Sequence, residues 1–154
     1  MVIGGYAVNT YALSRFSIDC DIVVMDKTEL KKIEQKLVGL DYIKGESNKP
    51  DIPYHGKFER YEKEIKDNFK VSMDILIQDV LDRQTNATFS AKWVFQNSET
   101  TALRGKTIQE ELKLRIINID ALFAMKMLSC RSTDIRDLFM LVANIKDVDW
   151  IKQE

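Results

Sequence analysis

Cysteine, proline and histidine are scarce in this chain of 154 residues, which contains two, two and one of them. The two cysteines, Cys20 and Cys130, are too few for a disulfide framework, and no Cys-x-x-Cys pair suggests a zinc site. The single histidine, His55, lies in a polar stretch without evident partners, so we expect no role for it. No apolar run reaches the ~18–20 residues that span a bilayer, and no signal-peptide pattern precedes the first glycines. We therefore expect a cytoplasmic protein without a membrane segment.

Neither sign of charge is in excess. The chain has 23 basic and 24 acidic residues, which gives a formal net charge of −1. It lacks the basic footprint of a dedicated nucleic-acid binder, although a local basic patch is compatible with this balance. With 45% hydrophobic and 31% charged residues and no repeat or linker, residues 1–154 are expected to form a single globular domain.

Hydrophobic periodicity predicts an α/β domain, with a mixed central sheet of three to five strands flanked by helices. Strands are expected at 2–5, 18–25, 56–65, 69–77 and 114–117, although 56–65 also fits a helix. Helices are expected at 6–13, 28–40, 120–128, 134–145 and 149–153, with Thr28, Asp120 and Thr133 as caps. We expect a loop at 48–53, where two prolines occur, and irregular chain at 107–112, whereas 80–101 fits short strands or helical turns.

The most informative motif is Asp19-Cys20-Asp21, which follows Gly5 by fourteen residues. Side chains alternate along a strand, so both carboxylates project from one face. They repel each other and resist desolvation, and a divalent cation such as Mg²⁺ relieves both penalties. Asp74, on the polar face of 69–77, adds a third carboxylate, and together they could hold two ions ~3.5–4 Å apart. The alternative is that all three are solvated acids on strand surfaces.

Three further features surround this motif. Gly4-Gly5, between an expected strand and an expected helix, can expose backbone N–H groups to a phosphate or can form a plain tight turn. Arg15 can offset negative charge on substrate or carboxylates, or can be a surface cation. Ser17 is a site hydroxyl or only a turn hydroxyl.

Lys126 lies in a helix, 121–128, that is apolar nearly all round and therefore mostly buried. A lysine in that setting either extends its ammonium group to the surface or faces an anion such as a nucleotide phosphate. The following segment carries Arg131, Asp134 and Asp137, and Asp137 is a candidate ion-pair partner for Lys126.

These residues, in this order, resemble the nucleotidyltransferase superfamily typified by DNA polymerase beta: a glycine turn, then Asp-x-Asp, then a third Asp on a later strand. The resemblance is closest to the AbiEii-like nucleotidyltransferases of toxin–antitoxin and phage-defence systems. It covers residues 2–25, 70–78 and 119–142, the last holding a lysine-and-aspartate motif like that of the subgroup, and leaves 80–112 unaligned. The family usually has a helix before the glycine turn, and threonine is frequent where Ser17 stands. The missing helix could leave a sheet face for a partner or a second copy, or reflect a truncated start.

The resemblance implies a nucleotidyltransferase fold and a metal-dependent enzyme. Asp19, Asp21 and Asp74 would hold Mg²⁺ or Mn²⁺. A nucleoside triphosphate would be bound by Gly4, Gly5, Arg15 and Ser17, with Lys126 assisting. The reaction would transfer a nucleoside monophosphate to an acceptor hydroxyl on RNA or tRNA, a protein or a small molecule. Such a protein could have a cognate antitoxin or form a homodimer. The alternative is a non-catalytic module of the same fold that acts through a protein partner.

Overall fold

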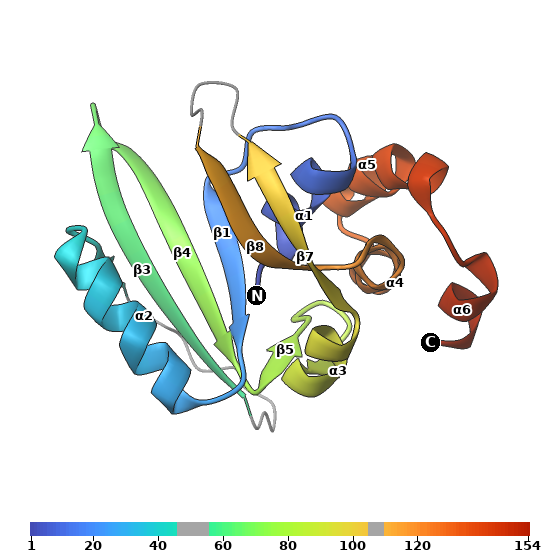
Figure 1. Cartoon of the computed structure of the whole chain (residues 1–154), viewed down its shortest axis with the longest axis horizontal. Helices are drawn as coiled ribbons and strands as arrows, with labels where there is room; N and C mark the ends of the chain where they lie inside the picture. Colours follow the sequence, from blue (N-terminus) through green and yellow to red (C-terminus); the bar gives the residue numbers. More distant parts are fainter. Residues whose placement is uncertain (46–55, 105–109) are drawn as a thin grey trace.

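The computed structural model describes residues 1–45, 56–104 and 110–154 of the chain. Its centre is a four-stranded sheet in the order β1-β4-β3-β2 (Figure 1). The strands are β1 (Asp19–Val24), β2 (Ile43–Lys44), β3 (Lys57–Lys66) and β4 (Phe69–Ile77). Strand β1 runs parallel to β4, whereas β3 is antiparallel to both β4 and β2. The mixed α/β architecture expected from the sequence is therefore confirmed.

Two hairpins extend this sheet. One pairs β7 (Ser98–Arg104) with β8 (Glu111–Ile117), and Val2 joins it to the sheet by bridging Ile22 and Ile116. The other is short and pairs β5 (Asp79–Leu81) with β6 (Thr88–Ser90). The strand expected at 2–5 is thus reduced to the bridge at Val2, because the helix starts already at Gly4.

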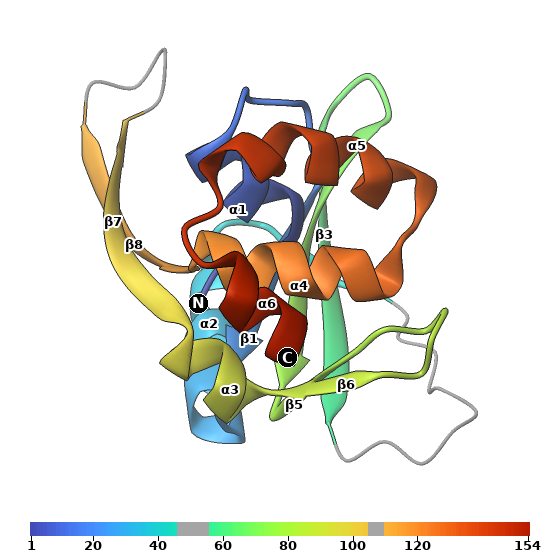
Figure 2. The same cartoon turned by 90° about the vertical axis from the view of Figure 1, so that its right-hand side faces the viewer.

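Six α-helices and one short 3₁₀ helix complete the described part of the chain. They are α1 (Gly4–Tyr11), α2 (Lys27–Gly39), α3 (Ala91–Gln96), α4 (Ile119–Ser129), α5 (Ser132–Leu141), η1 (Val142–Asn144) and α6 (Val148–Gln153). Helix α2 lies on one side of the sheet and α1, α4 and α5 lie on the other (Figure 1). Helices α4 and α5 lie side by side in the turned view (Figure 2).

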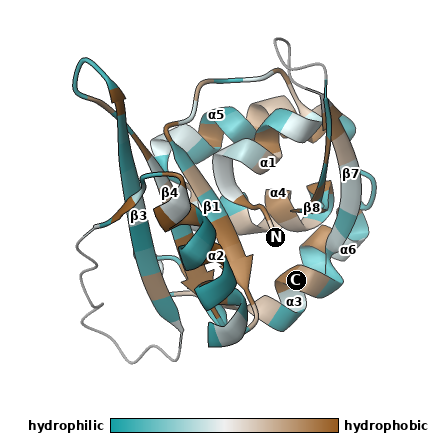
Figure 3. Ribbon diagram, turned by 60° about the vertical axis from the view of Figure 1, so that its left-hand side comes forward, coloured by the Kyte–Doolittle hydropathy of each residue, from teal (hydrophilic) through white to brown (hydrophobic). Residues whose placement is uncertain are grey.

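The sheet separates two apolar cores. The smaller core lies under α2, where Leu30 and Leu37 pack against Val24 and Ile75. Strand β1 behind this helix is largely hydrophobic, while the outward side of the helix is hydrophilic (Figure 3). The larger core lies on the other face and includes Val23, with residues of α1, α3 and α4. Neighbouring residues of β1 therefore enter different cores, as the strand period requires.

The three expected helix caps were each wrong by two residues. Helix α2 is capped by Asp26 rather than Thr28, since the Asp26 carboxylate accepts two backbone N–H bonds of the first turn at 2.7 and 3.0 Å. Asn118 caps α4 in the same way at 2.9 Å, and Asp120 lies inside the helix. Helix α5 begins before Thr133. In each case a residue upstream of the expected cap supplies the extended backbone that a cap needs.

Helix α5 is shorter than expected and turns a different face inward. It ends at Leu141, which is buried as expected, but its other two buried residues are the acids Asp134 and Asp137. The apolar spacing of 134–145 predicts that Ile135 and Val142 face inward, but they are 45% and 54% exposed. The reason is that cations from other elements neutralise the two acids, as described below.

The expected strands in the middle of the chain are largely present. The strand at 56–65 is confirmed as β3, and the strand at 69–77 is confirmed with the expected bounds. Strand β8 starts earlier than expected, so the part of 107–112 that is described is not wholly irregular. The expected loop at 48–53 and the residue His55 lie outside the described residues.

Candidate active site

A cavity of about 610 Å³ opens between the sheet and helices α1, α4 and α5. Every residue that the sequence proposed for the site contributes to its wall. These residues are Gly4, Gly5, Arg15, Ser17, Asp19, Asp21, Asp74 and Lys126. Among the described residues, five acidic and five basic side chains line the cavity. Segments far apart in the sequence thus meet around one polar space.

The three carboxylates meet because of how β1 and β4 pair. In this parallel pair Asp21 lies beside Asp74, and Asp19 lies beside Ser72. Paired residues of neighbouring strands project from the same face, so all three carboxylates face the cavity. The opposite face carries Ile75 toward α2.

Asp21 is the most perturbed of the three acids. Its pKa is raised from 3.8 to about 7, first because burial penalises the charged form and next because Asp74 and Asp19 are close. Lys126 and Arg60 oppose the rise without cancelling it. A cation bound next to this carboxylate would stabilise its ionised form.

The other two acids are already hydrogen-bonded. Asp74 accepts two bonds from Arg60, from Nε at 2.8 Å and from Nη2 at 2.6 Å. The Ser72 hydroxyl donates to Asp19. In this state no three His, Cys, Asp or Glu side chains are arranged to share a metal ion within residues 1–45, 56–104 and 110–154.

The donor set nevertheless fits a hard divalent cation. Three carboxylates face one cavity, and Mg²⁺ prefers oxygen ligands from a few carboxylates together with water and phosphate. The Arg60 guanidinium lowers the pKa of Asp21 only in part, because it is bonded to Asp74. The fit requires one adjustment: Arg60 must release Asp74.

The two glycines allow the start of α1 to approach these side chains. Gly4 has φ +63, and a Cβ atom there would lie 2.0 Å from Oδ2 of Asp21. A Cβ atom on Gly5 would lie 2.7 Å from Oγ of Ser17 and 2.9 Å from Nη2 of Arg15. The expected glycine turn is therefore the first turn of a helix, where backbone N–H groups have no partner in the helix and can bind an anion. The N-cap residue of this helix, Ile3, makes no side-chain capping bond.

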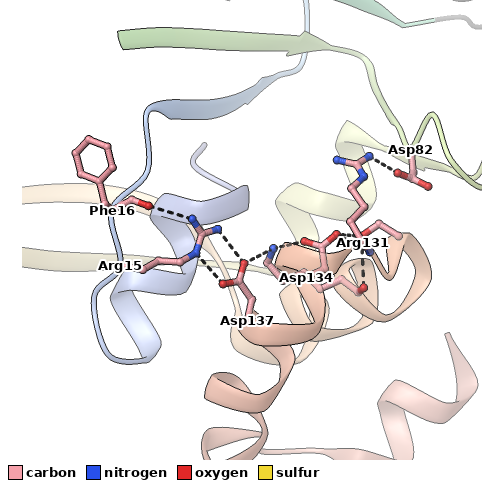
Figure 4. Close-up of polar contacts among 8 residues, drawn as sticks. Arg15, Phe16, Asp82, Arg131, Asp134 and Asp137 are labelled. Atoms are coloured by element: carbon pink, nitrogen blue, oxygen red, sulfur yellow. Dashed lines mark hydrogen bonds and ion pairs between the residues drawn. The ribbon is translucent and has the colours of Figure 1, made fainter. Parts of the chain in front are cut away.

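Lys126 is buried, not extended to the surface. Its Nζ lies 2.7 Å from Oδ1 of Asp134 and 2.8 Å from Oδ2 of Asp137. Arg15 reaches the same Asp137 carboxylate through Nε at 2.7 Å and Nη2 at 2.9 Å (Figure 4). The ion pair proposed between Lys126 and Asp137 is thus confirmed, and Arg15 is its third member.

Asp137 is fully buried at the centre of this network. Burial alone would raise its pKa, but hydrogen bonds from Arg15 and Lys126 outweigh burial and hold the pKa below its usual value. Two acids and two bases therefore neutralise one another. The network joins the loop before β1 to α4 and α5, so it fixes one wall of the cavity.

Arg131 closes another side of the cavity. Its guanidinium donates to Asp82, which follows β5, and so links the α4–α5 turn to the β5–β6 hairpin (Figure 4). Asp82 is buried and also accepts from the N–H and hydroxyl of Thr85, at 2.8 and 2.7 Å. Asp82 lies in the region 80–112, which the family resemblance does not cover, so its role was not predicted.

Arg60 is the principal residue that sequence reasoning missed. It lies on β3 directly opposite Asp74 on β4. The sequence offered one signal, the pair Asp67-Asn68, since these residue types are common in tight hairpin turns. In the structure both residues have positive φ, 51 and 63, as such a turn requires. Recognising that hairpin brings β3 beside Asp74, although it does not by itself identify which residue faces it.

A scan of models of known protein families finds no match to this chain, and a search of curated proteins finds no similar one. No helix in the described part of the chain has both the length and the apolar character needed to cross a membrane.

Proposed function

We propose that the protein transfers a nucleoside monophosphate from a nucleoside triphosphate to an acceptor hydroxyl, with release of pyrophosphate. The observation that carries the proposal is the meeting of Asp19, Asp21 and Asp74 in one cavity beside the uncapped start of α1. The fold is the mixed α/β arrangement described above, and its assignment to the nucleotidyltransferase superfamily is part of the proposal.

The carboxylates would divide the work by position. Asp19 and Asp21 lie on the same strand and face and would hold divalent ions jointly. Asp74, on the neighbouring strand, would share one of these ions and would help to deprotonate the acceptor hydroxyl and orient it toward the α-phosphate. When bound, Mg²⁺ or Mn²⁺ neutralises charge on the phosphates and on the attacking and leaving oxygens.

The triphosphate would lie along the opposite wall of the cavity. The backbone N–H groups at Gly4 and Gly5 and the helix dipole favour negative charge there. Lys126 and Arg15 supply positive charge nearby, although both are already paired with acids of α5. They would therefore position the glycine turn and set its potential, and catalysis would rest on orientation and electrostatics.

The proposal is tested with nucleoside triphosphates that carry ³²P at either the α- or the γ-phosphate. With Mg²⁺ or Mn²⁺ and fractionated RNA, protein and small-molecule extracts, α-label is expected to enter one acceptor fraction. The γ-label should leave as pyrophosphate and enter none. Transfer of the γ-label instead would overturn the reaction proposed.

The site assignment is tested by calorimetry. The double variant Asp19→Asn, Asp21→Asn should lose Mg²⁺-dependent nucleotide binding while its circular dichroism spectrum is unchanged. Asp67→Asn is the matched control, because Asp67 is an exposed carboxylate in the β3–β4 turn outside the cavity. Equal nucleotide binding by the double variant and the control would show that the carboxylates are not the site.

A second candidate is a non-catalytic module that binds a protein partner. It is favoured by the fact that Asp74 and Lys126 are already engaged in ion pairs within the chain. Large apolar side chains also lie exposed near one another in sequence, with Leu13 83% and Phe16 74% exposed. This candidate predicts no label transfer and no metal-dependent nucleotide binding in the experiments above.

A further inference from the structure

Arg60 and Asp74 form an ion pair with two hydrogen bonds that faces the cavity. They are direct partners in the antiparallel ladder between β3 and β4, so both side chains project from the same face. The two bonds, at 2.8 and 2.6 Å, use two guanidinium nitrogens and both carboxylate oxygens. Parallel bonds of this kind are stronger and more directional than a single contact between charges.

This pair occupies the oxygens that a metal ion would need. A carboxylate that accepts a bidentate guanidinium has its two inward-facing lone pairs engaged. Asp74 is buried, with 8% of its side chain exposed, so it has little other surface to offer a cation. The guanidinium also lowers the pKa of Asp21, which shows that its charge is felt across the carboxylate group.

The guanidinium can leave without disturbing either core. The Arg60 side chain is 36% exposed, which places it at the edge of the cavity. Its stem packs beside Gly45, where a Cβ atom would lie 3.5 Å from Arg60 Cγ. Its head lies 5.8 Å from the centre of the Phe58 ring, a surface on which a guanidinium can stack once it is released.

We propose that Arg60 is an internal counter-ion that holds Asp74 in the metal-free protein and must be displaced before a divalent cation binds there. The inference rests on the proposed function, because it concerns the same carboxylates. It makes Arg60 a positioning residue that sets how readily the site takes up metal. The free protein would then bind divalent ions weakly, and binding would be completed when a triphosphate supplies further oxygen ligands.

The test measures Mn²⁺ affinity without nucleotide, by electron paramagnetic resonance of free Mn²⁺ at about pH 8, above the raised pKa of Asp21. Arg60→Gln is expected to bind Mn²⁺ about tenfold more tightly than the unchanged protein, because a bidentate charged competitor has been removed. Arg60→Lys, which keeps the charge but not the fork, should fall between the two. Arg83→Gln is the matched control, since Arg83 lines the same cavity and lies 5.6 Å from the same Phe58 ring.

The outcomes separate the inference from the function on which it rests. Tighter binding by Arg60→Gln and unchanged binding by Arg83→Gln support the inference. Unchanged or weaker binding by Arg60→Gln overturns it, while the proposed function stands if the Asp19→Asn, Asp21→Asn variant still loses Mn²⁺. If neither the unchanged protein nor Arg60→Gln binds Mn²⁺, with or without nucleotide, the proposed metal site itself is wrong.

Discussion

Replacing Asp21 with asparagine is expected to make the metal-free protein more stable. Asp21 lies between Asp19 and Asp74 in a partly closed cavity, and its pKa is raised to about 7. The folded state therefore binds this proton more tightly than the unfolded chain does. The contribution of protonated Asp21 to the free energy of unfolding is fully present below about pH 4. It is lost progressively as the pH rises to about 7, and above that it is absent. Asparagine has a similar shape and carries no charge at any pH.

The size of the effect follows from the shift. A rise from 3.8 to about 7 corresponds to roughly 4 kcal/mol at pH 8 if the whole shift is expressed. Water that enters the open cavity screens part of it, so we expect a gain of about 1–3 kcal/mol in the free energy of unfolding. At pH 5 the gain should be smaller, because folded Asp21 is then largely protonated.

The assay is urea unfolding, followed by tryptophan fluorescence at pH 5 and pH 8 in the presence of a chelator. Asp21→Asn is compared with the unchanged protein and with Asp67→Asn, which removes a solvated carboxylate. A gain that is the same at both pH values would refute the reasoning, because it could not come from the ionisation of Asp21. A loss at pH 8 would refute it as well.

Three further predictions concern the same cavity. Asp137→Asn should lower the free energy of unfolding by about 3 kcal/mol at neutral pH, because it leaves the buried Lys126 and the partly exposed Arg15 underpaired; urea unfolding should show the deficit shrinking in acid, as the lowered pKa of Asp137 implies. Gly4→Ala should weaken Mg²⁺-dependent nucleotide binding in calorimetry, because φ is +63 there and the new Cβ atom meets the Asp21 carboxylate, whereas Gly39→Ala, with nothing within 4 Å, should not. Mg²⁺ should raise the melting temperature more at pH 8 than at pH 5, since its ligands must be ionised, and an equal rise at both would argue against carboxylate ligands.

The parts of the site that follow a simple strand period could be predicted from the sequence. Asp19 and Asp21 share a face because the strand alternates, and the same rule placed Asp74 on the polar side of β4. Their meeting depended on β1 pairing with β4, a parallel contact between segments about fifty residues apart. That these two strands are neighbours was an assumption, since the local sequence does not state which strands pair.

Arg60 shows why the rest was out of reach. At the turn, Lys66 pairs with Phe69, but beyond it the register shifts so that Glu64 pairs with Lys70. Without this irregularity Tyr61, not Arg60, would lie opposite Asp74. The shift turns Tyr61 into the core under α2 and Arg60 toward the carboxylates. A one-residue change of register reverses every side chain of a strand, and no pattern in this polar segment predicts it.

Helix α5 presents a different difficulty. Its apolar spacing suggested that Ile135 and Val142 face inward, because burial normally follows hydrophobicity. Instead Asp137 is buried, since Arg15 and Lys126 reach it from two other elements. Such compensation is a property of the tertiary structure, and only the position of Lys126 in an apolar helix hinted at it.

Within the part of the chain that the structure describes, equal numbers of acidic and basic side chains line the cavity, and this balance affects the rate of association. A nearly balanced wall attracts neither a free polyanion nor a free cation over distances beyond the Debye length, which is about 8 Å at physiological ionic strength. Long-range steering then contributes little to the rate of association, and added salt should change that rate only slightly. The electrostatic cost of entering the cavity is smallest for a ligand whose own charges are largely cancelled. A nucleotide that is already complexed with its ion is such a ligand.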